Sequence, residues 1–124
     1  MNLKRLPILL TATFFLIAGL NHFIHPAFYL PLIPDYLLYP EIINAFSGSV
    51  EILLSFGLIF KQTRKYTCIG LIVMLIAFIP SHIYFISIGS CIENGLCIPS
   101  WAAWLRLLII QPALIFWIYR LKNQ

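Results

Sequence analysis

Hydrophobic residues along the chain fall into four long runs, separated by shorter segments that are richer in polar, charged and proline residues. Each run is roughly 20 residues long, which at about 1.5 Å per residue is enough for a helix to cross a hydrocarbon layer of about 30 Å. The runs lack the strict alternation of barrel strands. The pattern therefore predicts four membrane-spanning helices, over approximately residues 6–24, 42–60, 66–88 and 101–119.

The composition supports this interpretation. Of the 124 residues, 61% are hydrophobic and only 10% are charged, which is too few to cover the surface of a soluble domain. Four helices joined by short links form an antiparallel up-and-down bundle. We therefore expect an all-α integral membrane protein, with one four-helix transmembrane domain over residues 1–124 and the lipid bilayer as its surroundings.

The basic residues predict the orientation. Seven of the eight Lys and Arg residues lie before the first run, between the second and third runs, or after the fourth run. Because short cytoplasmic segments carry the excess of Lys and Arg, we expect the N-terminus, the C-terminus and a "KQTRK" turn at residues 61–65 to be cytoplasmic. The net charge of +4 is then an orientation signal, and no nucleic-acid partner is predicted.

The first outer connection, residues 25–41, carries four prolines and several aromatic residues. Each proline removes a backbone donor and disfavours helix at the preceding residue, which excludes a long regular helix. Phe and Tyr suit the membrane interface, where a ring can lie in lipid and a hydroxyl in water. We expect this segment to lie on the outer membrane surface and to cover the bundle.

Cys91 and Cys97 flank the second outer connection. A disulfide between them would close a seven-residue ring and stabilise it by roughly 2 kcal/mol. The spacing is compatible with a structural disulfide, with a working redox pair and with two free thiols. C-x5-C is, however, not the C-x-x-C spacing that tunes thiol reactivity.

Polar and small residues gather on one face of the predicted second helix when its positions are plotted at about 100° per residue. In a membrane such residues mark the face that contacts other helices, because hydrocarbon cannot satisfy them. This face is formed by Asn44, Ser47, Gly48, Glu51 and Ser55.

Four ionisable residues, one from each predicted helix, are expected to converge in the outer half of the bundle: His22, Glu51, His82 and Arg106. A carboxylate or guanidinium buried alone in hydrocarbon is costly, whereas a pair offsets that cost. We therefore predict that Arg106 neutralises Glu51, with both histidines in the same network. The network is either a polar ligand or proton site, or a structural device that fixes helix register.

Two histidine arrangements are weaker candidates for holding a metal. His22 and His25 stand three residues apart and could reach one metal ion or one quinone head group. His22 and His82 could hold a haem from two sides inside a four-helix bundle. Because His25 precedes Pro26 near the interface and bulky residues fill the bundle, we predict no metal site.

Four blocks, one per predicted helix, resemble the DoxX-like family of small four-helix membrane proteins, which is related to the MauE-like family. The blocks are "AGLNHFIHPAFY" (18–29), "SGSVEILLSFGLIF" (47–60), "IPSHIYF" (79–85) and "WLRLLIIQ" (104–111). Positions that match the family pattern are Gly19, His22, Phe23, Pro26, Gly48, Glu51, Pro80, Tyr84, Trp104, Arg106 and Leu107.

The chain departs from that pattern in the fourth block and at one histidine. Gln111 stands one residue later after the arginine than the pattern has it, and Leu108 replaces a proline. On a regular helix this displacement rotates Gln111 by about 100°. His82 stands where the family pattern has asparagine or histidine.

The resemblance implies a four-helix fold in the bacterial inner membrane and a link to quinone-coupled sulfur oxidation or to redox maturation in the cell envelope. The first functional hypothesis is therefore a redox-associated membrane subunit that binds a quinone in the outer half. In it, Glu51 and His22 carry protons, Arg106 anchors the ligand, and a membrane or periplasmic redox protein is the partner.

Two further hypotheses come from other classes of function. One is a non-enzymatic bundle that binds another membrane protein or further copies of itself, with a purely structural polar core. The other is a small-solute carrier or proton leak, although four short helices without an inverted repeat leave little room for alternating access. An accessory subunit is favoured over a stand-alone enzyme.

Overall fold

The computed structural model describes residues 2–124, which form helices and connecting loops and contain no β-strand. Four helical segments are long and apolar enough to cross a membrane: Leu3–Ile24, Pro40–Ile59, Lys61–Ser87 and Ser100–Leu121. The first contains η1 (Leu3–Arg5) and α1 (Leu6–Ile24), and the second is α3 (Pro40–Ile59). Two short elements, α2 (Pro26–Tyr29) and η2 (Leu30–Leu32), lie between them.

The third and fourth segments are interrupted helices. The third consists of α4 (Lys61–Ala77) and α5 (Ile79–Ser87), where the prediction had one helix over 66–88. Pro80 accounts for the break, since it lacks an N–H and its ring clashes with the carbonyl four residues earlier. The fourth consists of α6 (Ser100–Leu105), a π-helical turn η3 (Arg106–Ile110) and α7 (Gln111–Leu121).

The predicted turn at residues 61–65 is helical in the structure, which corrects the sequence interpretation. Only Phe60 separates α3 from α4. Arg64 is buried and donates hydrogen bonds from Nε to the Leu58 carbonyl oxygen (2.9 Å) and from Nη2 to that of Ile59 (3.1 Å). The last carbonyls of a helix need such donors, so Arg64 caps α3 and makes the sharp turn possible.

Arg64→Met is expected to lower the free energy of unfolding by about 1–2 kcal/mol, because it removes a cation and two hydrogen bonds from the end of α3. Thermal unfolding of the detergent-solubilised protein measures the effect. Lys65→Met is the matched control, since it removes the same charge from an exposed neighbour on the same helix. Equal destabilisation by both variants would show that charge, and not the cap, matters.

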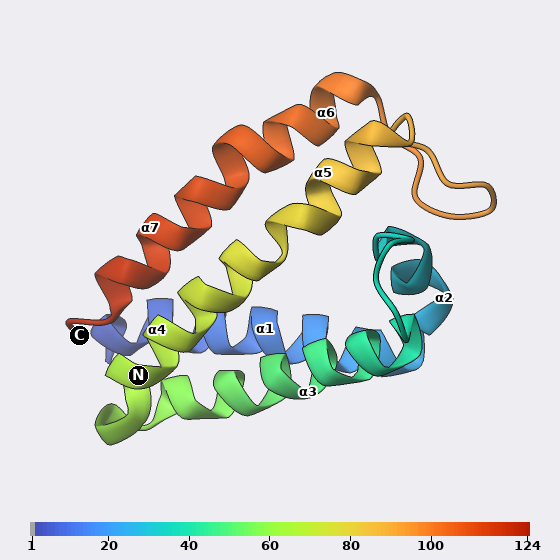
Figure 1. Ribbon diagram of the computed structural model, residues 1–124. Coiled ribbons are helices and arrows are strands. Elements are labelled where there is room, and N and C mark those ends of the chain that lie inside the picture. Colours follow the sequence, from blue (N-terminus) through green and yellow to red (C-terminus); the bar gives the residue numbers. More distant parts are fainter. Residues whose placement is uncertain (1) are drawn as a thin grey trace.

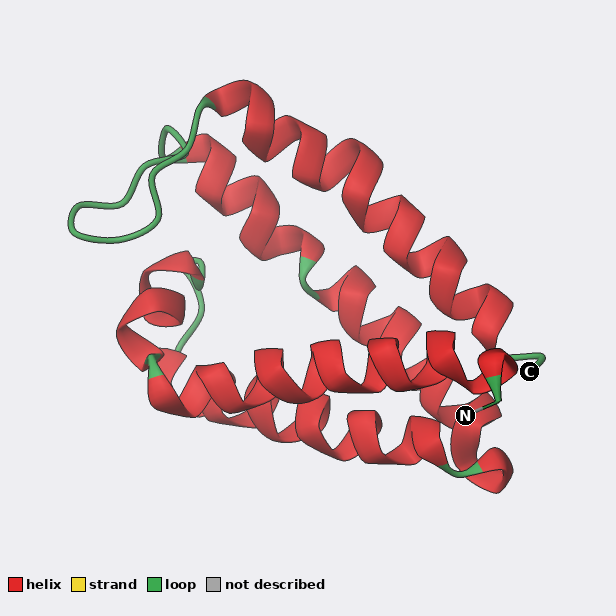
Figure 2. Cartoon of the chain, turned by 180° about the vertical axis from the view of Figure 1, so that it is seen from behind, coloured by secondary structure: helices red, strands yellow, loops and turns green. Residues whose placement is uncertain are grey.

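The helices form two antiparallel hairpins that diverge (Figures 1 and 2). The first hairpin is α1 with α3, and the second is α4–α5 with α6–η3–α7. They meet at the end that holds the α3–α4 turn and both ends of the described chain, which we call the basic end because seven of the eight Lys and Arg residues lie there. The opposite end, the loop end, holds α2, η2 and the loop between α5 and α6, and η2 contacts both α3 and α5.

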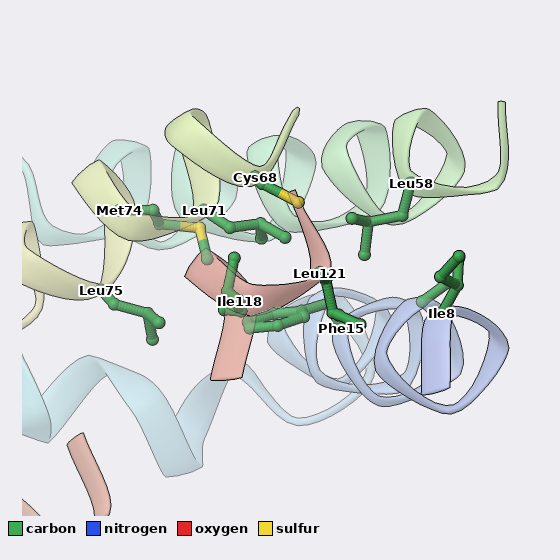
Figure 3. Packing of buried hydrophobic residues seen from close by; sticks show 10 residues of the cluster. Ile8, Phe15, Leu58, Cys68, Leu71, Met74, Leu75, Ile118 and Leu121 are labelled. Atoms are coloured by element: carbon green, nitrogen blue, oxygen red, sulfur yellow. The ribbon is translucent and has the colours of Figure 1, made fainter. Parts of the chain in front are cut away.

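The apolar core lies at the basic end, where the two hairpins meet. Figure 3 shows side chains from α1, α3, α4 and α7 pointing toward one another there. The cluster consists of Ile8, Ala12, Phe15, Leu58, Cys68, Leu71, Met74, Leu75, Ile118 and Leu121. The two hairpins are therefore held together mainly at one end, where α7 closes against α1 and α4.

Two glycines bring α1 and α3 into close contact. A Cβ atom added to Gly48 would lie 2.7 Å from His22 Cβ, and one added to Gly19 would lie 2.9 Å from the Gly48 carbonyl oxygen. Small residues allow this approach, which drives helix packing where no hydrophobic force acts between helices. The contact fixes His22 of α1 next to Glu51 of α3, one turn beyond Gly48.

Candidate functional site

The centre of the candidate site is a buried pair formed by His22 and Glu51, whose exposed fractions are 7% and 4%. His22 Nε2 lies 3.4 Å from Glu51 Oε2, and Oε2 has no partner within hydrogen-bond geometry. This is the one ion pair among residues 2–124. The predicted partner of Glu51 was Arg106, and that prediction is wrong: the neighbouring ionisable group is the histidine on the facing helix.

Asn44 and Tyr29 hold the His22 ring in place. His22 Nδ1 lies 2.7 Å from Asn44 Oδ1, and Asn44 Nδ2 donates to the His22 carbonyl oxygen at 2.9 Å. Tyr29 of α2 stacks on the ring with its centroid 3.8 Å away, and its hydroxyl accepts a hydrogen bond from Asn21 Nδ2 at 2.9 Å. Contacts from α2 and α3 therefore leave the ring little freedom to turn.

Arg106 belongs to the second hairpin and pairs with an amide. Its Nη1 donates to Gln111 Oε1 at 2.6 Å, and Gln111 Nε2 donates to the Leu75 carbonyl oxygen, also at 2.6 Å. Gln111 is 1% exposed; its hydrogen bond to Leu75 is buried, and the one that it accepts from Arg106 is partly buried. This chain links η3 and α7 to the last turn of α4, just before the break at Phe78.

The π turn explains why Arg106 and Gln111 meet. The Gln111 N–H donates to the Arg106 carbonyl oxygen, five residues earlier, whereas a regular α-helical hydrogen bond joins residues four apart. The π turn therefore contains one extra residue. The rotation of about 100° expected for Gln111 on a regular helix is thereby compensated. Pro112 follows directly and, at the start of α7, needs no backbone donor of its own.

His82 of α5 is half-buried, and α5 contacts η3, which begins at Arg106. The four predicted residues therefore form two groups, one on each hairpin: His22 with Glu51, and His82 with Arg106. The single network expected from the sequence is not present in the structure, because the hairpins diverge toward the loop end.

Cys91 and Cys97 are joined by a disulfide across the loop between α5 and α6. Both residues are exposed at the loop end, and the Ile92 N–H bonds to the Leu96 carbonyl oxygen inside the ring. The third cysteine, Cys68, is buried in the core at the other end of the molecule.

The remaining candidates do not gather around a ligand. His25 is exposed at the end of α1, whereas His22 is buried, and within residues 2–124 no three His, Cys, Asp or Glu side chains lie close enough to hold a metal ion. A groove of about 410 Å³ runs between the two parts of the second hairpin, and its lining is apolar except for Gln111 and Tyr119. None of the four predicted site residues lines it.

Two site residues were not identified as such from the sequence. Asn44 was placed on the polar face of its helix, and its position seven residues before Glu51 was the signal that both face the same neighbour. Gln111 was noticed only as a departure from a pattern. A regular helical projection cannot show a π turn, although the adjoining Pro112 marks a place where the regular hydrogen bonds are interrupted.

Comparison with protein families gives a match to the family described as a domain of unknown function, DUF8561, over residues 11–122. Neither the curated proteins nor the solved structures gave a match. The matched region contains all four apolar segments in large part, both groups of site residues and the disulfide. Because it covers most of the chain, this protein belongs to the DUF8561 family.

Proposed function

We propose that this protein is a multi-pass protein of the bacterial inner membrane with both termini in the cytoplasm, and that it acts as a quinone-linked, redox-associated subunit of a cell-envelope system. Four apolar helical segments support the membrane location. The basic end supports the orientation, since it gathers the termini and the α3–α4 turn with most of the Lys and Arg residues. The resemblance to DoxX-like proteins supports the redox class.

The observation that carries the function is the buried His22–Glu51 pair. Ionisable groups inside membrane spans often belong to proton pathways, and reduction or oxidation of a quinone takes up or releases protons. A carboxyl group beside an imidazole can deliver such a proton. The exposed disulfide at the loop end faces the side on which we propose a membrane or periplasmic redox partner.

Titration of purified protein with a short-chain quinone, followed by tryptophan fluorescence, tests this function. Glu51→Gln keeps the shape of the side chain but cannot ionise, and we expect it to weaken quinone binding by about tenfold or more, the loss of one hydrogen bond to a charged group. Glu41→Gln makes the same change at an exposed position of the same helix and should bind as the wild type does. Unchanged binding by folded Glu51→Gln would contradict the proposal.

A second candidate function, a non-enzymatic bundle that binds a further membrane protein or another copy of itself, is favoured by the divergence of the hairpins. Only 17–33% of each apolar segment is buried inside the molecule. Most of the surface of each segment is therefore available to lipid or to another protein. Sedimentation of the detergent-solubilised protein tests the self-association form of this function, and a monomer at all concentrations would contradict that form.

A further inference from the structure

We propose that His22 and Glu51 together hold a single proton, and that Asn44 is the positioning residue that fixes where this proton lies. This inference deepens the proposed function, since it concerns the same site, but it rests on the two hydrogen bonds between Asn44 and His22 and on the close contact of His22 with Glu51, and not on any ligand. It follows from which atoms can donate and which can only accept a hydrogen in three contacts between α1 and α3: two between Asn44 and His22, and one between His22 and Glu51.

The first step is the orientation of the Asn44 amide. A backbone carbonyl oxygen only accepts hydrogen bonds, so the Asn44 atom that lies 2.9 Å from the His22 carbonyl oxygen must be the amide nitrogen. The other amide atom, 2.7 Å from His22 Nδ1, is then the oxygen Oδ1. The two contacts assign the amide without ambiguity, because exchanging its atoms would bring two acceptors together at the carbonyl.

The second step is the tautomer of His22. An amide oxygen has no hydrogen to donate, so His22 Nδ1 must carry the hydrogen of the 2.7 Å bond. In a neutral imidazole with its hydrogen on Nδ1, the other nitrogen, Nε2, has only a lone pair. That lone pair faces Glu51 Oε2 at 3.4 Å.

The third step is the proton between the two side chains. An ionised carboxylate oxygen also has only lone pairs, and it would repel a bare Nε2. The contact becomes attractive when one further proton is present, bound either to Nε2, which gives an imidazolium beside a carboxylate, or to Oε2, which gives a carboxylic acid beside a neutral imidazole. Both forms have zero net charge, which is the state that a buried site in a medium of low dielectric constant favours.

The neighbouring groups do not supply a different compensating charge. From α2, Tyr29 stacks on the ring, and its hydroxyl is bound by Asn21. The other titratable side chains on the two helices near this site, His25 and Glu41, are exposed, and η2 carries none. Arg106 on the second hairpin is bonded to Gln111. Loss of the proton would therefore leave a buried negative charge, and gain of a second proton would leave a buried positive charge.

Nuclear magnetic resonance of the ring nitrogens, in protein with isotope-labelled histidine and without any quinone, tests the proposal. We expect His22 Nδ1 to be protonated at every pH at which the protein is folded. In Glu51→Gln, Nδ1 should remain protonated while the signature of the proton shared at Nε2 is lost. Exposed His25 in the same sample is the internal control for the ring-nitrogen signals, because Glu51→Gln leaves its surroundings unchanged.

Asn44→Leu supplies the test of the positioning role. Without the acceptor at Nδ1, the ring hydrogen is expected to move to Nε2, where it is donated to Glu51. The second proton then stays on the Glu51 carboxyl group, so that the pair keeps zero net charge, and the Nδ1 signal changes to that of an unprotonated nitrogen. If this variant fails to fold, the wild-type spectrum still decides: an unprotonated Nδ1 in the folded wild type would overturn the proposal. Retention of Nδ1 protonation in folded Asn44→Leu would overturn the role of Asn44.

The outcomes separate this inference from the proposed function. A protonated Nδ1 and a shared proton, combined with normal quinone binding by Glu51→Gln, would refute the quinone role and leave the proton site standing. An unprotonated Nδ1 combined with loss of quinone binding in Glu51→Gln would refute the proton site and leave the quinone role standing.

Discussion

Gly48→Ala is expected to destabilise the protein by about 2–3 kcal/mol, which is the upper part of the range for overpacking a close contact. The added methyl group would lie 2.7 Å from His22 Cβ and 3.0 Å from the Gly19 carbonyl oxygen. One of these atoms is backbone and the other is attached to it directly, so neither can move unless α1 and α3 separate. Separation would also pull His22 away from Glu51.

Gly70→Ala is the matched control for this prediction. Gly70 is also inside a helix, but the three atoms nearest to a Cβ atom there all belong to the end of the Leu54 side chain, the closest at 3.1 Å, and a flexible side chain can yield. Since alanine is favoured over glycine in helices by about 0.5–1 kcal/mol, this variant should be nearly as stable as the wild type or slightly more stable. Denaturant unfolding of both variants in detergent, followed by circular dichroism, measures the difference. Similar stability of the two variants would refute the close α1–α3 contact.

Gln111→Leu is expected to lower stability by about 2–4 kcal/mol, because it removes one buried and one partly buried hydrogen bond, whose loss costs about 1–3 kcal/mol each. The Leu75 carbonyl oxygen would lose the donor that it receives from Gln111, and Arg106 would lose its acceptor. Leucine has a similar volume, so packing alone should change little. The measurement is the same unfolding experiment.

Two comparison variants make this prediction specific. Gln62→Leu makes the same substitution at an exposed position of α4 and should have little effect. Gln111→Glu keeps an acceptor for Arg106 but, when ionised, has no hydrogen to donate to the Leu75 carbonyl oxygen. Its stability should therefore fall between those of the wild type and Gln111→Leu. If Gln111→Leu is as stable as the wild type, the link between η3 and α4 contributes nothing to stability.

The spans were predictable because hydrocarbon thickness fixes the length of an apolar helix. For the first span, the predicted range 6–24 coincides with α1 (Leu6–Ile24). Interruptions were harder to foresee, since they depend on local backbone geometry: Pro80 breaks the third span, and the π turn replaces a regular turn in the fourth. Hydropathy does not register either feature.

The candidate site was predictable in part. The polar face of the second span identified Glu51, Asn44 and Gly48 as facing a neighbouring helix, and all three are buried. The wrong pairing of Glu51 with Arg106 has a clear physical reason. A helical projection gives the direction of a side chain around its own axis, but it says nothing of the angle between two hairpins. The prediction paired Glu51 with Arg106 because their charges are opposite, whereas in the structure Arg106 is hydrogen-bonded to the neutral amide of Gln111.

The divergence of the hairpins also has a consequence for the surrounding lipid. In the orientation that we propose, the narrow basic end lies in the cytoplasmic leaflet and the wide loop end lies in the outer leaflet. The molecule is then a wedge that displaces more lipid from the outer leaflet than from the inner one. Such a shape favours membrane that bulges outward. The composition and curvature of the bilayer therefore help to set the angle between the two hairpins.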